Sequence, residues 1–231
     1  MMALVLVHPL QFVVVGELSV VHHRNVGERI SPEGMRVVYV HSAFGRHAGS
    51  LASVRPDNLL AHVIKTVVER NPFAATAYED VIIGNTNGAG EDCRNVARFA
   101  GLLAGMDTAV GGLTVNRLCG SGLAATLDAA RAVKVGEGEL FVSGGVESMS
   151  RAPIILTKAQ SAYDRGQQIA DSTLGARFTN PAFAAAYGND AMPQTADNIA
   201  SDIGISREQS DSFAAASQAR YEAARADGFY Q

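Results

Sequence analysis

From residue 35 onward, short runs of apolar and β-branched residues alternate with longer stretches whose apolar positions recur at helical spacing. The short runs predict buried strands at residues 37–40, 81–83, 113–115 and 140–143. The longer stretches predict helices at residues 56–69, 95–103 and 123–134. Strands that are separated by helices need crossover connections. The pattern therefore predicts an α/β fold with a mainly parallel sheet and helices on both faces.

The predicted helix at residues 123–134 has its own signals. Leu123, Leu127, Ala130 and Val133 recur at helical spacing, so we expect them to form its buried face. Gly136 follows the helix at the position where a C-terminal cap is common.

The pattern changes after Met149. Residues 150–192 are rich in Ala, Gly, Asp and Pro and show little periodicity, which predicts an irregular excursion over the sheet. Long excursions of this kind are either disordered or cover a ligand. Two helices are predicted after it, one at 193–203 and one from a capping box at Ser206 and Gln209 to about residue 226.

This pattern predicts three parts. Residues 1–34 form an extension of uncertain role, in which Met35 is a candidate natural start. Residues 35–148 form the core of a domain, and residues 149–231 form a loop subdomain with the helices that follow, cut short at the end.

Composition narrows the functional classes. The chain has 231 residues, of which 47% are hydrophobic, enough to bury a substantial core. The formal net charge is -4 and no basic run stands out, so nucleic-acid binding is not expected. No apolar stretch is long enough to predict a membrane span, and the apolar start lacks the positive residues of a signal peptide.

The chain has two cysteines, Cys93 and Cys119. Two cysteines make no disulfide framework, and this pair lacks the Cys-x-x-Cys spacing of zinc sites, so no metal is expected. Free thiols favour a reduced, cytoplasmic setting. We expect Cys93 to be a tolerated small side chain without chemistry.

Cys119 lies between a predicted strand and a predicted helix and is followed by Gly-Ser-Gly. The N-terminus of a helix has unpaired N–H groups and a partial positive charge, which favour a thiolate, the nucleophilic form. We expect Gly120 and Gly122 to permit a sharp turn and a close substrate approach, with N–H groups that can stabilise an oxyanion. Asn116 and Ser121 are expected to satisfy backbone groups of this turn. The ordinary alternative is that Cys119 is an inert buried thiol. The residues alone do not decide between this role and that of a nucleophile.

Residues 116–123, Asn-Arg-Leu-Cys-Gly-Ser-Gly-Leu, resemble the nucleophile segment of thiolases. Residues 144–150, Gly-Gly-Val-Glu-Ser-Met-Ser, resemble a second recurring segment of that family, in which Glu147 is expected to stabilise the turn after the fourth predicted strand. Residues 90–98 and 192–198 are similar to the family too. Within the family, loop residues 150–153, 178–181 and 187–193 are most like the 3-oxoadipyl-CoA thiolases of aromatic-compound breakdown.

The resemblance implies a layered thiolase-like fold, of which this chain holds the N-terminal half. It implies acyl transfer between CoA and a 3-oxoacyl-CoA, in which Cys119 attacks the 3-oxo carbon and holds an acyl thioester. Coenzyme A and acyl-CoA would be substrates, and no cofactor is implied. The resemblance also implies a homo-oligomer and places Met192 near the pantetheine of CoA, where anchoring a loop is the alternative role.

The resemblance also implies residues that this sequence lacks. Family members carry a catalytic His in a Gly-His-Pro segment and a second Cys in a Cys-x-Gly segment, and neither segment occurs here. None of the six histidines lies in such a segment, and we expect the chain to stop before the last strand of its sheet. We therefore expect little turnover from this chain alone.

Three alternatives remain. The chain could be a non-catalytic module that binds acyl-CoA or a partner, or one chain of a split enzyme. A dinucleotide-binding domain is less well supported, because no Gly-x-Gly-x-x-Gly follows the first predicted strand.

Overall fold

The computed structural model describes residues 17–23, 35–43, 45–71, 73–173 and 175–229, with backbone only for 17–23 and 35–39. The predictions for residues 1–16 and 24–34 lie outside this range. The described residues fall into two compact units, one up to residue 173 and one from residue 175. The predicted boundary at residue 149 follows β5 closely, and the division into parts stays a prediction.

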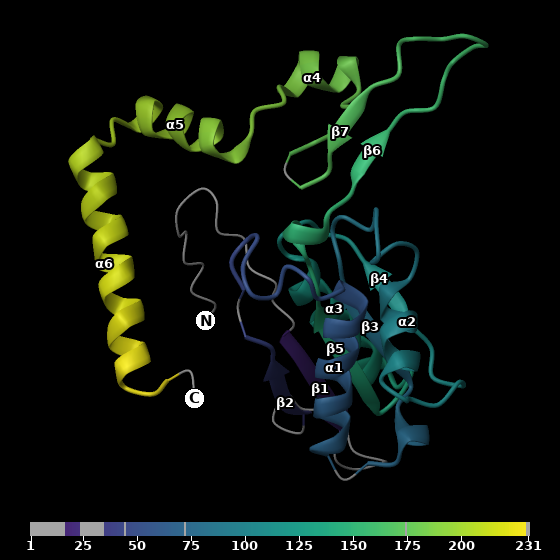
Figure 1. The fold of residues 1–231 in the computed structure, drawn as a ribbon. Coiled ribbons are helices and arrows are strands. Elements are labelled where there is room, and N and C mark those ends of the chain that lie inside the picture. Colours follow the sequence, from purple (N-terminus) through teal and green to yellow (C-terminus); the bar gives the residue numbers. More distant parts are fainter. Residues whose placement is uncertain (1–16, 24–34, 44, 72, 174, 230–231) are drawn as a thin grey trace. The chain divides into compact units, whose positions relative to one another are not determined.

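The larger unit is built on a five-stranded sheet in the order β2-β1-β5-β3-β4 (Figure 1). The strands are β1 (Glu17–His23), β2 (Met35–His41), β3 (Asp80–Gly84), β4 (Leu113–Val115) and β5 (Leu140–Gly145). Strand β3 pairs parallel with β4 and β5, whereas β1 pairs antiparallel with β2 and β5. Strands β2 to β5 therefore share one direction, and the prediction of a mainly parallel α/β sheet is confirmed.

Helices cover both faces of this sheet. They are α1 (Pro56–Glu69), α2 (Val96–Leu103) and α3 (Ser121–Val135), and a short 3-10 turn, η2 (Ala75–Ala77), precedes β3. Val81 and Ile83 of β3 pack in one core cluster with α1 and α2. Ile82 lies between them in sequence and packs in the other cluster with α3. Side chains alternate across a strand, so α1 and α2 cover one face and α3 covers the other, as predicted.

The buried face of α3 differs from the prediction. The helix buries Ser121, Ala125, Ala129 and Val133, whereas Leu123 is 55% and Leu127 43% exposed. Small alanine side chains let the helix approach the sheet closely, so the alanine stripe faces inward. Helical spacing alone does not distinguish two neighbouring apolar stripes. Gly136 caps the helix with a φ of 81°, in agreement with the prediction.

The sequence pattern did not identify β1, which lies in the extension at residues 1–34. Its pairing with β5 joins residues more than a hundred positions apart, and such distant pairing gives no local signal in the sequence. The segment expected to be irregular also contains order. It holds most of a 3-10 turn, η3 (Met149–Arg151), a hairpin of β6 (Ile154–Leu156) and β7 (Ile169–Asp171), and a helix, α4 (Pro181–Tyr187).

The smaller unit consists of three helices, α4 (Pro181–Tyr187), α5 (Met192–Ile203) and α6 (Arg207–Ala226). The predicted capping box is present. Ser206 accepts a hydrogen bond from the Gln209 amide at 3.3 Å, and the Gln209 side chain accepts one from the Ser206 amide at 2.8 Å. No helix in the described part of the chain combines the length and apolar character needed to cross a membrane.

Candidate functional site

Cys119 lies between β4 and α3, at the edge of the sheet where the parallel strands β3, β4 and β5 end. Gly120 is the N-cap of α3, and the helix begins at Ser121 and runs for 15 residues. The Cys119 side chain is exposed and forms no disulfide. The thiol therefore lies beside the positive end of a helix dipole and is open to a reactant. This exposure disagrees with the alternative of an inert buried thiol.

The backbone at this turn is tight and strained. Leu118, directly before Cys119, has a φ of 50°, a conformation that non-glycine residues rarely adopt. The Gly120 amide donates to the Arg117 carbonyl at 3.1 Å, and the Ser121 amide donates to the Leu118 carbonyl at 3.0 Å. Strain of this kind costs about 1–3 kcal/mol and is concentrated at functional sites. The conformation of Leu118 therefore adds an observation that the sequence did not provide.

Two polar side chains hold the turn. The Ser121 hydroxyl accepts from the Arg117 amide at 2.8 Å and donates to the Leu118 carbonyl at 2.6 Å. The Asn116 side chain accepts from the Leu118 amide at 2.9 Å, and its amide nitrogen donates to the Thr86 carbonyl at 3.0 Å. These four bonds fix the segment around Cys119 and connect it to the loop after β3.

The loops after β3 and β5 are also joined to each other. The Glu147 carboxylate accepts from the Thr86 amide at 2.8 Å, from the Thr86 hydroxyl, and from the Asn87 amide at 3.3 Å. Buried Asn85 donates to the Val146 carbonyl at 3.0 Å. Glu147 therefore supports two loops, whereas the sequence predicted support of its own turn. The part played by Asn85 was missed, although a polar residue directly after a buried strand is a recognisable signal.

Glycines let the N-terminus of α3 lie directly against the sheet. A Cβ atom at Gly84 would lie 2.3 Å from the Ser121 carbonyl carbon and 2.4 Å from the Gly122 nitrogen. A Cβ at Gly145 would lie 3.2 Å from the Gly84 carbonyl oxygen and 3.4 Å from the Gly122 Cα. At Gly84 only glycine allows an approach this close, and at Gly145 a Cβ would make tight contacts, so β3 and β5 set the position of the first turn of α3.

The amide groups of this first turn divide into two sets. Those of Gly120 and Ser121 already bind carbonyls of the turn. Gly122 and Leu123 follow within the first helical turn, where amides have no partner inside the helix. The predicted oxyanion role of this segment remains a prediction.

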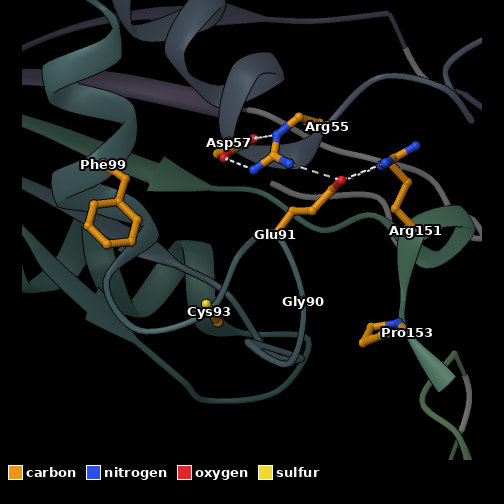
Figure 2. Close-up of a pocket in the computed structure, with 8 residues that line it drawn as sticks. All are labelled: Arg55, Asp57, Gly90, Glu91, Cys93, Phe99, Arg151 and Pro153. Carbon is orange, nitrogen blue, oxygen red and sulfur yellow. Dashed lines mark hydrogen bonds and ion pairs between the residues drawn. The ribbon is translucent and has the colours of Figure 1, made fainter. Parts of the chain in front are cut away.

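A separate open pocket of about 530 Å³ lies near the start of α1 (Figure 2). Its lining does not include Cys119 and consists of Arg55, Asp57, Gly90, Glu91, Cys93, Phe99, Arg151 and Pro153. Figure 2 shows Glu91 between Arg55 and Arg151, and Glu91 accepts hydrogen bonds from both. Binding to Arg151 lowers the pKa of the Glu91 carboxyl.

The charges of this pocket balance within the protein. Arg55 also binds Asp57 at 2.6 Å, so two guanidinium groups face two carboxylates. No positive charge is left over to attract a phosphate. We interpret the group as a clamp that joins the loop at residues 90–93 to α1 and η3.

Two predicted residues remain, Met192 and Cys93. Met192 is the first residue of α5 in the smaller unit and is 60% exposed, so its contact with CoA remains a prediction. Cys93 is exposed and lines the pocket at Glu91. No group of three or more His, Cys, Asp or Glu in the described residues is placed to hold a metal ion.

Comparison with known proteins identifies the family. Residues 37–231 match the family described as thiolase, N-terminal domain. The chain is 53% identical over 192 residues to the beta-ketoadipyl-CoA thiolase of Acinetobacter baylyi, covering 83% of this chain and 48% of that protein. It is 51% identical over 190 residues to the 3-oxoadipyl-CoA/3-oxo-5,6-dehydrosuberyl-CoA thiolase of Escherichia coli, covering 82% and 47%.

A solved structure has the same fold. The crystal structure of the Bacillus anthracis acetyl-CoA acetyltransferase matches with a TM-score of 0.63 and 27% identity, over 86% of this chain and 44% of that one. The chain spans about half the length of the curated relatives it matches. The family match covers most of the chain and includes the whole Cys119 turn, so this chain belongs to the thiolase family.

Proposed function

We propose that this chain carries the nucleophile of a degradative thiolase that acts on 3-oxoadipyl-CoA or a similar 3-oxoacyl-CoA. One observation carries the proposal. The exposed Cys119 thiol lies on a strained turn at the N-terminus of α3. The names of the relatives at 51–53% identity support the choice of substrate. A cytoplasmic location and a homo-oligomeric assembly belong to the same proposal.

The proposed reaction has two covalent steps. The Cys119 thiolate attacks the 3-oxo carbon, and the bond between C2 and C3 breaks. The electron pair of that bond passes to C2, which takes a proton to give acetyl-CoA, and the acyl group remains on Cys119 Sγ as a thioester. A second CoA thiolate then attacks the thioester and releases the shortened acyl-CoA and free Cys119. CoA is a substrate throughout, and the proposal needs no cofactor or metal.

The residues of the turn have defined tasks in this scheme. The helix dipole favours the thiolate, and first-turn N–H groups of α3 would stabilise the developing oxyanion. Asn116 and Ser121 would hold those groups in place without touching the substrate. The proton transfers need further groups, which the family resemblance places in Gly-His-Pro and Cys-x-Gly segments. Loss of a general base typically lowers a rate by about 10²–10⁴, so we propose that this chain turns over little when alone.

A mass-spectrometric experiment tests this proposal. The chain is incubated with 3-oxoadipyl-CoA, alone and with the C-terminal half of the Acinetobacter baylyi relative, and its peptides are mapped. We expect an acyl adduct on Cys119 that increases when the second half is present. Cys119→Ala should abolish the adduct and Cys93→Ala should preserve it. An adduct-free Cys119 in both mixtures would contradict the proposal.

One observation favours a second candidate, a module that binds a partner chain. Leu123 and Leu127, in the first half of α3, are both exposed. Exposed apolar patches mark interaction surfaces. Such a module would bind the C-terminal half equally well as wild type and as Cys119→Ala, and neither mixture would form an adduct. A split enzyme would bind in the same way but would form the adduct.

A further inference from the structure

Strand β1 holds the sheet of the larger unit together. It lies between β2 and β5 and is antiparallel to both. Val20, at its centre, pairs with Val38 of β2 on one side and with Val142 of β5 on the other. In the described sheet, β2 pairs with no strand except β1. Without β1, β2 would therefore have no hydrogen-bonded contact with the rest of the sheet.

Strand β1 lies outside the residues that match the thiolase family. The match begins at residue 37, so β5 and five of the seven residues of β2 belong to the thiolase domain, whereas residues 17–23 do not. Two strands that flank a third are about 10 Å apart, too far for direct backbone hydrogen bonds. The thiolase-type residues of this chain thus contain a slot for one strand between β2 and β5. The two strands that border the slot, β2 and β5, run in the same direction, and β1 between them runs in the opposite direction.

We propose that Glu17–His23 is a built-in complementing strand, supplied by a segment outside the thiolase domain to close this slot. Its sequence suits that task, because Val20 and Val21 are adjacent β-branched residues, which favour strands. Pairing with β1 gives hydrogen-bond partners to backbone groups along one edge of β5 and one edge of β2. Open edges of that kind recruit other strands and promote aggregation.

The complementing strand also reaches the candidate site. Leu18 pairs with Gly144, at the carboxyl end of β5. The next residue, Gly145, lies against Gly84 and Gly122, which position the first turn of α3. The pairing of β1 therefore extends to the end of β5 that supports the Cys119 turn.

Hydrogen exchange measured by mass spectrometry tests the proposal in the full chain. Val20→Pro removes an N–H from the centre of a strand that is paired on both sides, whereas the control Val20→Ile keeps strand geometry and the N–H. We expect exchange in peptides covering 35–41 and 140–145 to become at least about tenfold faster in V20P, with peptides of α1 unchanged. V20I should exchange like the wild type. Unchanged exchange in V20P would overturn the proposal.

Cysteine cross-linking provides a second test if V20P fails to fold. His22 lies opposite Arg36 in the register of β1 and β2, whereas Ser19 lies opposite Tyr39. In a chain with both native cysteines replaced by serine, His22→Cys with Arg36→Cys should form a disulfide under mild oxidation. The out-of-register pair Ser19→Cys with Arg36→Cys should not. Equal cross-linking of the two pairs, or cross-linking of neither, would overturn the proposal, and thiolase activity does not enter this test.

Discussion

Replacing Gly84 with alanine should separate the first turn of α3 from the sheet. The new Cβ would lie 2.3 Å from the Ser121 carbonyl carbon, and ordinary contacts begin at 3.4 Å. The backbone must therefore move by about 1 Å, in a region where neither partner is a flexible side chain. Overpacking of a core typically costs about 1–3 kcal/mol, and backbone contacts place this case near the upper limit. For a unit of this size, about 3 kcal/mol corresponds to a fall in Tm of about 6–12 °C.

Urea denaturation and the rate of Cys119 labelling by a thiol reagent measure the two consequences. Gly84→Ala should lower the free energy of unfolding and change the labelling rate, because Ser121 and its bonds to the Cys119 turn move with the helix. Gly101→Ala, in helix α2, is the matched control. Its Cβ would lie 3.5 Å from Val81 Cγ2 of β3, which is an ordinary van der Waals contact. It should be neutral or stabilise by up to about 1 kcal/mol. Equal unfolding midpoints for wild type and G84A would refute the close approach of α3 to β3.

Three further predictions concern single side chains. Ser121→Ala removes two hydrogen bonds of the Cys119 turn. It should lower the free energy of unfolding, measured by urea denaturation, by about 1–3 kcal/mol. A loss no larger than that of Ser210→Ala would contradict this prediction. Glu91→Gln should reduce the fall in the free energy of unfolding as the pH is lowered. Because Arg151 lowers the folded-state pKa of Glu91, this carboxylate stabilises the protein above its unfolded pKa of about 4.3, and that contribution of about 1 kcal/mol is lost as the pH falls through the folded value. An unchanged slope between about pH 5 and pH 3 would argue against the clamp. Ser206→Ala should destabilise α6 by about 1 kcal/mol, seen as lost helicity by circular dichroism, whereas Ser206→Asn should retain it.

The helices and parallel strands were predictable because their signals are local. Residues 56–69 were expected to be helical, and α1 has these bounds. The cap at Gly136 and the capping box at Ser206 were also expected, since both depend on residues within a few positions. The strand–turn–helix setting of Cys119 follows from the same kind of signal.

Features that depend on distant partners were not predictable. The position of β1 depends on pairing with residues 140–144. The choice between the alanine and leucine stripes of α3 depends on how closely the helix approaches Gly84 and Gly145. The positive φ of Leu118 results from a turn that is closed by Ser121 and Asn116, and no rule for leucine would place it there.

In the proposed function, positioning the candidate nucleophile and activating it are separate tasks. The described groups that hold the Cys119 turn are glycines on β3 and β5, two polar side chains of the turn, and the loops joined by Glu147. They fix the backbone of the turn that carries the Cys119 thiol. Proton transfer is a different requirement, since it needs a titratable group within hydrogen-bond reach of the reacting atoms. A chain that is organised in this way should keep the geometry of the Cys119 turn when the C-terminal half of a thiolase is absent. Acyl transfer to Cys119 should become faster when that half is supplied. The acyl-adduct experiment with and without the C-terminal half of a relative therefore measures activation alone, because the turn is already in place.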